Sequence, residues 1–239
     1  MKTEESILSP SCASCEIEQI NRRCLSEKGE VSKGCPTVSR KKVLKIADER
    51  YNDPEELKFA QQASRQEADG YDNKFDSEKR SLAFNPIKTR IVEICEFADK
   101  MDYQRIGLAF CIGLAGEAAV VEKVLQKRGF DVVSVVCKAG CVPKERIGLK
   151  KEEFVVPEIG EMIPGASETM CNPIFQAEVL NTEKTEFNIV LGLCVGHDSL
   201  FFKHADAYTT VLAVKDRVTG HNPLAAIYQS SSYYRKIMQ

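Results

Sequence analysis

The sequence has no tryptophan, only three histidines and no long hydrophobic run among its 239 residues. A transmembrane helix needs a stretch of about 20 apolar residues, so we expect no membrane partner. The N-terminal stretch MKTEESILSPSC has no apolar segment of the kind found in a secretory signal peptide. We therefore expect a cytoplasmic protein, in which thiols stay reduced.

The chain also has little net charge. It carries 33 Lys and Arg against 35 Asp and Glu, a formal net charge of −2. Such a balanced charge creates no long-range field that would attract nucleic acid or an anionic membrane, and we expect neither as a partner. The 43% hydrophobic and 28% charged fractions are typical of a globular protein that buries a core.

Three regions differ in composition. Residues 1–40 contain few large apolar side chains, and glycine and proline interrupt them. Such a segment stays disordered unless something crosslinks it. Residues 41–103 are expected to be helical and to pack on the core, and residues 104–239 alternate between strand and helix patterns.

Cysteine is abundant in the first region. Four of the ten cysteines are spaced Cys12-x2-Cys15-x8-Cys24-x10-Cys35. Four thiolates complete a tetrahedral, closed zinc site, and the binding free energy then orders the segment. Four sulfurs also suit an iron–sulfur cluster, and Cys35-Pro36 resembles the end of a bacterial ferredoxin motif, although the gaps between the cysteines are longer. Unrelated reduced thiols are the third alternative.

Helix signals mark the second region. Asp53 is a plausible N-cap, followed by Pro54 at the first helical position and by acidic residues in the first turn. A second helix is predicted to open at Asn85-Pro86, with apolar residues at 3-to-4 spacing that include Cys95. We interpret Cys95 as a core residue.

Four apolar segments of the third region predict buried strands: 105–113, 130–141, 187–196 and 208–216. Amphipathic helices are predicted between them, at 115–129, 171–186 and 197–206. Near-continuous apolar strands separated by helices are typical of a parallel sheet covered on both faces. We therefore predict a three-layer α/β sandwich, Rossmann-like, with a mostly parallel sheet of four or five strands and a helical N-terminal half.

Cysteines recur where these strands end. Ligands of an open parallel sheet bind beyond the carboxyl ends of the strands, and five cysteines fall near that edge: Cys111, Cys137, Cys141, Cys171 and Cys194. The first two lie at the ends of apolar strands, and we interpret them as core packing. The last three lie in glycine- or proline-flanked turns and are candidate cofactor ligands for an iron–sulfur cluster or a zinc with an open position.

A thiolate nucleophile is the alternative for this edge. Cys171 and Cys194 are candidates, because a helix N-terminus lowers the pKa of a nearby thiol. His197 is a candidate general acid or base beside Cys194, although it and Asp198 could equally satisfy first-turn amides. Basic residues nearby could bind an anion, although surface exposure is the simpler interpretation for them: Lys138, Lys144 and Arg217. For His204 and His221 we favour packing and turn roles.

The cysteine-rich start, followed by the segments GLCVGHDSLFFK and KDRVTGHNP, resembles a prokaryotic family of uncharacterised metal-binding proteins. That family is a domain of unknown function with an N-terminal four-cysteine cluster. The resemblance covers nearly the whole chain. It implies that Cys12, Cys15, Cys24 and Cys35 hold a metal ion, and it implies no reaction.

The leading functional hypothesis is therefore a metal-binding protein, with zinc at the N-terminal cysteines and a second, cysteine-lined site at the carboxyl edge of the sheet. The first alternative is an iron–sulfur or thiolate-dependent enzyme that acts on a small anionic molecule. The second alternative is a non-catalytic sensor or scaffold that uses the cysteine cluster to dock a partner protein.

Overall fold

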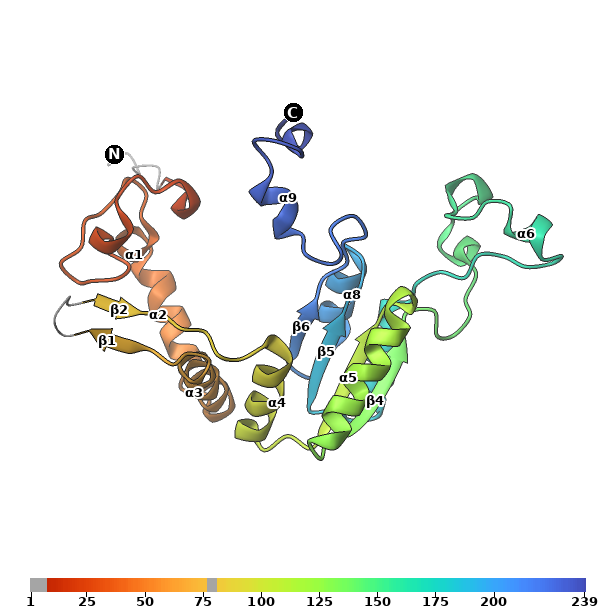
Figure 1. Cartoon of the computed structure of the whole chain (residues 1–239), viewed down its shortest axis with the longest axis horizontal. Helices are drawn as coiled ribbons and strands as arrows, with labels where there is room; N and C mark the ends of the chain where they lie inside the picture. The colour runs from red at the N-terminus through yellow and green to blue at the C-terminus, as the bar shows by residue number, and fades with distance from the viewer. Residues whose placement is uncertain (1–7, 77–80) are drawn as a thin grey trace, which may run out of the picture. The chain divides into compact units, whose positions relative to one another are not determined.

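The computed structural model describes residues 8–76 and 81–239. The chain divides into two compact units, residues 1–64 and 65–239, which are described separately (Figure 1). The boundary lies within helix α3, Pro54–Asp69. Within the described residues, none of the helices is both long and apolar enough to cross a membrane.

The N-terminal unit consists of turns, short helices and little else. Two 3-10 turns, Cys12–Ser14 and Gln19–Asn21, precede helices α1 (Pro36–Ser39) and α2 (Lys41–Arg50). None of residues 8–64 is buried. The expectation that residues 1–40 lack a hydrophobic core is confirmed for the described residues 8–40. Residues 41–64, which were expected to pack on the core, contain no buried residue either.

Helix α3 begins as its sequence predicts. The Asp53 side-chain Oδ1 accepts hydrogen bonds from the backbone amides of Glu55 (2.9 Å) and Glu56 (3.0 Å). This carboxylate satisfies two of the amides that have no partner within the first helical turn. A short antiparallel pair follows, β1 (Lys74–Asp76) with β2 (Ser81–Ala83), which the sequence did not predict.

Helix α4 (Arg90–Met101) starts later than expected. Its predicted apolar stripe is buried at Ile94, Cys95 and Ala98, whereas Ile87 precedes the helix and is 54% exposed. Phe97 of α4 packs against Phe187, with ring centroids 5.5 Å apart. The interpretation of Cys95 as a core residue is confirmed.

The predicted strands form one sheet. Its strands are β3 (Arg105–Phe110), β4 (Asp131–Val136), β5 (Phe187–Leu191) and β6 (Thr209–Ala213). They are all parallel, in the order β4-β3-β5-β6. All five residues of β5 are buried, as a strand in the middle of a covered parallel sheet should be.

Helices connect these strands: α5 (Ala115–Lys127), α7 (Pro173–Thr182) and α8 (His197–His204). The chain moves from β3 to β4 in one direction and then returns past β3 to β5. Right-handed crossovers therefore place α5 and α7 on opposite faces of the sheet, and Figure 1 shows α5 covering one face. The predicted three-layer α/β sandwich is confirmed, with four strands.

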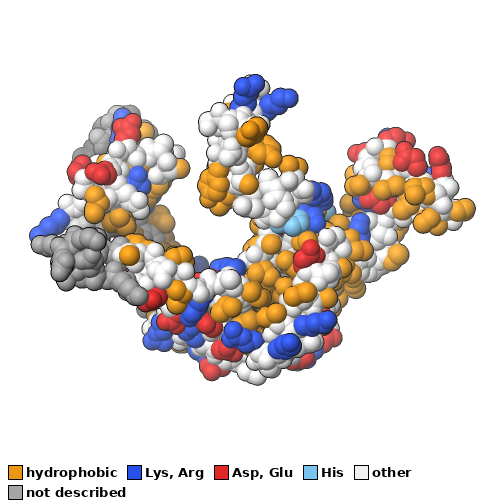
Figure 2. Space-filling view, in the orientation of Figure 1, with side chains coloured by type: hydrophobic (Ala, Val, Ile, Leu, Met, Phe, Trp, Pro, Cys, Tyr) orange, Lys and Arg blue, Asp and Glu red, His pale blue; other side chains and the backbone are white. Residues whose placement is uncertain are grey.

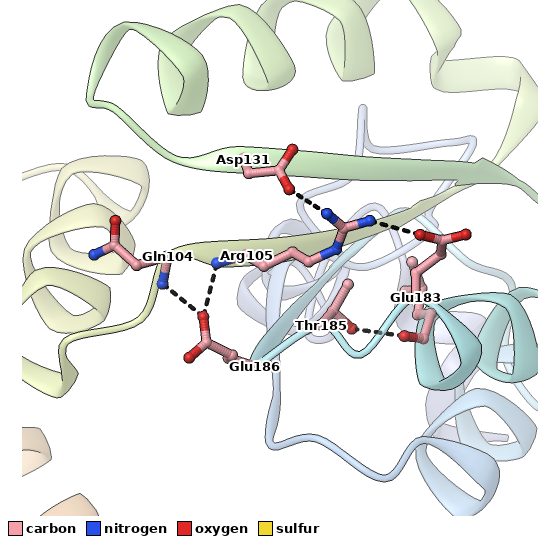
Figure 3. A network of polar contacts seen from close by, with 7 residues as sticks. Gln104, Arg105, Asp131, Glu183, Thr185 and Glu186 are labelled. Carbon is pink, nitrogen blue, oxygen red and sulfur yellow. Dashed lines mark hydrogen bonds and ion pairs between the residues drawn. The ribbon is translucent and has the colours of Figure 1, made fainter.

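The amino-terminal edge of the sheet is held by ionic contacts (Figure 3). Arg105, at the start of β3, forms ion pairs with Asp131 of β4 and with Glu183, the latter at 2.5 Å. Glu186 Oε2 accepts hydrogen bonds from the backbone amides of Gln104 (2.7 Å) and Arg105 (2.8 Å). These contacts tie β3 to both of its neighbours at the edge opposite the cysteines.

Candidate functional site

Cysteines follow three of the four parallel strands. Cys111 comes directly after β3, Cys137 comes directly after β4, and Cys194 lies between β5 and α8. Because the strands are parallel, their carboxyl ends meet at one edge of the sheet. The predicted concentration of thiols at this edge is therefore real.

Cys171 reaches the same edge through the loop before α7. The backbone amide of Asn172 donates a hydrogen bond to the Cys137 carbonyl oxygen (2.8 Å). The Asn172 side chain accepts one from the Phe175 amide (3.0 Å), which caps α7. One residue therefore starts the helix and fixes the preceding cysteine beside Cys137. The sulfurs of Cys171 and Cys137 lie 3.6 Å apart, within hydrogen-bond distance.

The surroundings of Cys171 favour its thiolate. The hydrogen bond with Cys137 is the largest cause of its lowered pKa; a hydrogen bond from the His197 side chain follows, and the Lys138 charge adds to both. Burial opposes the shift. When both thiols are protonated, the Cys171 thiol donates to Cys137. Once Cys171 loses its proton, Cys137 becomes the donor and stabilises the charge.

Cys137 is the opposite case. Its side chain is only 2% exposed, and the hydrogen bond with Cys171 and then burial raise its pKa above the ordinary thiol value. The Ile112 amide donates to its sulfur at 3.4 Å. The sequence interpretation of Cys137 as a buried residue is confirmed, but that interpretation missed its contact with Cys171. Its position at the end of β4 was the available signal.

The other two predicted cysteines of this edge have different partners. Cys194 Sγ accepts a hydrogen bond from Arg217 Nη2 (3.0 Å), and Cys141 is exposed, with its sulfur 3.8 Å from Thr169 Oγ1. In the described part of the chain, no three Cys, His, Asp or Glu side chains gather closely enough to hold a metal ion. Cys171 and His197 are thus near each other. Cys194 instead pairs with Arg217, and Cys141 lies beside Thr169.

Basic side chains surround the thiols. The Lys138 ammonium donates to the Thr169 carbonyl oxygen, two residues before Cys171. Lys215 lies close to Gly113, at the turn after β3. On the face drawn in Figure 2, Lys and Arg side chains (blue) lie next to a histidine (pale blue) near the carboxyl ends of the strands. Lys144, a predicted anion ligand, instead forms an ion pair with Glu168 at 2.7 Å.

The remaining polar candidates have structural roles. Asp198 Oδ1 accepts hydrogen bonds from the Gly196 (2.9 Å) and Ser199 (2.7 Å) amides, so it organises the start of α8. His221 Nδ1 accepts one from the Asp216 amide (3.1 Å), which confirms its predicted turn role. Asp198 therefore caps the start of α8, whereas the adjacent His197 lowers the pKa of Cys171.

The four N-terminal cysteines line one pocket, together with the backbone and side chains around them. Arg22 organises this segment by donating to the carbonyl oxygens of Ile17 (2.8 Å) and Cys15 (3.1 Å). Gly29 packs so closely on the Arg22 backbone that a Cβ would lie 2.5 Å from its carbonyl oxygen. All ten cysteines of the chain are free thiols.

The chemistry and position of these four thiols decide whether they suit a metal ion. Four free thiols on one pocket match the donor set of a structural zinc site. A hydrogen bond from the Ile17 amide, followed by one from Ser32, lowers the pKa of Cys15, which favours the thiolate that metals bind. Among the described residues, no three of these side chains lie close enough together to hold a metal ion. The donor set therefore fits, and binding requires the thiols to move closer together.

An uncharacterized protein of Methanocaldococcus jannaschii, MJ0455, is 47% identical over 152 residues, which cover 64% of this chain and 72% of the relative. No solved structure matches the chain. The model of a family described as a protein of unknown function, DUF1847, matches residues 35–212. That range includes Cys137, Cys171 and His197 and begins at Cys35. The resemblance to a family of unknown function is confirmed, its metal binding stays a prediction, and the chain belongs to the DUF1847 family.

Proposed function

We propose that the protein is a thiolate-dependent enzyme in which Cys171 is the nucleophile and the substrate is a small anionic molecule. One observation carries this proposal: the Cys171 sulfur lies 3.6 Å from a second sulfur, that of Cys137, and Cys137 and the His197 side chain both lower the pKa of Cys171. A thiolate is the reactive form of cysteine, and these two donors stabilise it. The thiol is partly exposed, so a small molecule reaches it.

Each neighbour has a definable role. Cys137 donates a hydrogen bond to the thiolate and thereby holds its charge. His197 also lowers the pKa of Cys171, and its proposed role is to give a proton to a leaving group as the sulfur attacks. Lys138 adds a positive charge, which favours an anionic substrate over a neutral one.

The first experiment measures alkylation of Cys171 by iodoacetamide against pH, followed by peptide mass spectrometry. Because the Cys171 pKa is lowered, its thiolate persists as the pH falls, and we expect fast alkylation down to about pH 6, below the ordinary thiol range. Cys137→Ala removes the main donor and should move the profile to higher pH. Cys137→Ser keeps a hydroxyl donor and should move it less.

Two controls sharpen this measurement. Cys141, an exposed thiol of the same chain, is the internal reference, and Cys95→Ala alters a buried cysteine of α4 without touching the site. A Cys171 profile that coincides with that of Cys141 would overturn the proposal. The preference for anions is tested by comparing iodoacetate with iodoacetamide. The ratio of the two alkylation rates, iodoacetate over iodoacetamide, should be higher at Cys171 than at Cys141. Lys138→Met should lower that ratio at Cys171.

A second function, metal binding at the N-terminal segment, is supported by a separate observation. Cys12, Cys15, Cys24 and Cys35 line one pocket, in a segment of which no described residue is buried. We propose that these four thiolates hold zinc and that the ion takes the place of a hydrophobic core. An iron–sulfur cluster is the alternative for the same four ligands.

Metal analysis of the full-length protein, purified without oxygen, separates these alternatives. We expect a colourless protein with one zinc per chain. A brown protein that contains iron would instead indicate an iron–sulfur cluster. The double variant Cys12→Ser/Cys15→Ser should lose the metal and become more sensitive to proteolysis before residue 41, while Cys95→Ala keeps both properties. Metal retained in the double variant would contradict the assignment.

A further inference from the structure

Cys137 has a feature that stabilising a thiolate does not require: it is itself a thiol. Its sulfur lies 3.6 Å from that of Cys171, and its side chain is only 2% exposed. A backbone hydrogen bond from Asn172 to the Cys137 carbonyl (2.8 Å) holds the two chain segments together beside the sulfurs. A hydroxyl or amide would donate a hydrogen bond equally well, but only a thiol can form a bond to sulfur.

We propose that Cys137 and Cys171 form a dithiol–disulfide couple that reduces a small hydroperoxide, with Cys171 as the attacking sulfur and Cys137 as the resolving sulfur. This inference rests on the proposed function, because it requires a reactive Cys171. It goes further by naming the oxidant class and a second cysteine that takes part in the reaction.

The exposure of the two thiols sets the order of events. Cys171 is partly exposed, whereas Cys137 is buried behind it, so an oxidant from solution meets Cys171 first. A disulfide bond has a length of about 2.0 Å. The two sulfurs, now 3.6 Å apart, need to approach each other by only about 1.6 Å to reach that length. The hydrogen bond of the Asn172 amide need not break.

The chemistry balances in two steps. The Cys171 thiolate attacks the terminal oxygen of the hydroperoxide, the O–O bond breaks, and the alkoxide takes a proton from His197 to leave as an alcohol. Cys171 is then a sulfenic acid. The Cys137 sulfur attacks the Cys171 sulfur, its thiol proton goes to the departing hydroxide, and water leaves. In total, two thiols lose two electrons and two protons, and one hydroperoxide becomes one alcohol and one water.

The cycle closes with a small dithiol as the reductant. One thiolate of the dithiol attacks the more exposed Cys171 sulfur and releases Cys137, and the second thiol displaces Cys171 and leaves as a cyclic disulfide. The reductant therefore loses the two electrons that the hydroperoxide gained. The buried Cys137 sulfur is shielded from this attack, which directs the reductant to one side of the bond.

The test uses full-length reduced protein and hydrogen peroxide. After treatment, free thiols are blocked with N-ethylmaleimide and the peptides are mapped by mass spectrometry. We expect a disulfide between Cys137 and Cys171, one peroxide consumed for each disulfide, and full reversal by dithiothreitol. Cys95→Ala should form the same disulfide, because it leaves the pair intact.

The variant Cys137→Ser separates this inference from the proposed function. It should still alkylate at Cys171 in mildly acid solution, form no disulfide, and accumulate a sulfenic acid at Cys171 that dimedone traps. Fast alkylation of wild-type Cys171 without a disulfide to Cys137 would overturn the couple and leave the nucleophile standing. Slow alkylation together with no disulfide would overturn both. A peroxide-induced disulfide between Cys171 and any other cysteine would also overturn the couple.

Discussion

Cys171 and Cys137 show how two residues of one type acquire opposite properties from their surroundings. Their sulfurs are 3.6 Å apart, yet Cys171 is partly exposed and faces a histidine and a lysine, while Cys137 is buried at the end of a strand. The charge of the pair therefore resides on Cys171. The hydrogen bond between the two sulfurs lowers the pKa of Cys171 and raises that of Cys137.

At this scale, we predict the effect of His197→Ala. The His197 hydrogen bond is the second largest cause that lowers the Cys171 pKa, so its removal should raise that pKa and slow alkylation at about pH 6, where an ordinary thiol is protonated. At alkaline pH the variant and the wild type should react at equal rates. His204→Ala, on the same helix α8, is the matched control. An unchanged profile in His197→Ala would show that the imidazole does not stabilise the thiolate.

The connection between β4 and α7 positions Cys171. Its two ends pair with each other through an antiparallel bridge between Pro143 and Thr169. The Met170 amide donates to Val142 (2.8 Å), and the Lys144 amide donates to Glu168 (3.0 Å). The loop therefore leaves and returns at the edge of the sheet, and Cys171 follows its last paired residue.

Glu168 fastens this connection through its side chain. Its two carboxylate oxygens accept from Lys144 Nζ (2.7 Å) and from the Val156 amide (3.0 Å). Burial tends to raise the pKa of Glu168, but these hydrogen bonds outweigh burial and lower it. A carboxyl whose folded pKa is lowered stabilises the fold above its unfolded pKa, and this contribution is lost as the pH falls through the folded pKa.

We therefore predict that Glu168→Gln lowers the free energy of unfolding at pH 7 by roughly 1–3 kcal/mol, because it removes a charge from a largely buried pair. Urea unfolding at a series of pH values checks this. The difference between variant and wild type should begin to shrink as the pH falls below about 4, the ordinary range of a glutamate carboxyl, and should vanish once the pH has passed through the lowered pKa of Glu168. Glu153→Gln, at an exposed position in the same connection, should have a smaller effect. A difference that is constant with pH would rule out the ion pair as its source.

Within residues 65–239, the two edges of the sheet have different tasks. The amino-terminal edge carries the ion pairs of Arg105 with Asp131 and Glu183, and the carboxyl edge carries the thiols. The ion pairs and the thiols thus lie at opposite ends of the strands. The N-terminal unit, residues 1–64, has no buried residue among those described and depends on a different source of order.

This separation predicts the behaviour of Arg105→Met. The variant loses both ion pairs of a side chain that is 37% exposed, and it should lower the free energy of unfolding by about 1 kcal/mol, since exposed pairs contribute little. Thermal or urea unfolding measures this loss. Alkylation of Cys171 should remain as in the wild type under conditions where the variant is folded. A changed alkylation profile in the folded variant would show that the two edges are coupled.

Local sequence patterns were sufficient for the four strands of the parallel sheet and for the start of α3, but not for the β1–β2 pair or for the start of α4. Apolar runs predicted β3, β4, β5 and β6, since a strand covered on both faces must be apolar along its length. Asp53 predicted the start of α3, because an N-cap acts within a few residues of itself. The sparse apolar content of residues 1–40 predicted that this segment has no hydrophobic core, and the crowding of cysteines at one sheet edge followed from strand direction alone.

The contacts among those cysteines depended on tertiary structure. Cys137 and Cys171 are separated by 34 residues, and the spacing does not indicate that they meet or that Cys194 pairs with Arg217 instead. That choice depends on how the connection between β4 and α7 closes and where the Asn172 hydrogen bond fastens it. The sequence determined that thiols lie at the carboxyl ends of the strands. Tertiary packing determined the distances between their sulfurs and the burial of Cys137, and these decide which thiol loses its proton more easily.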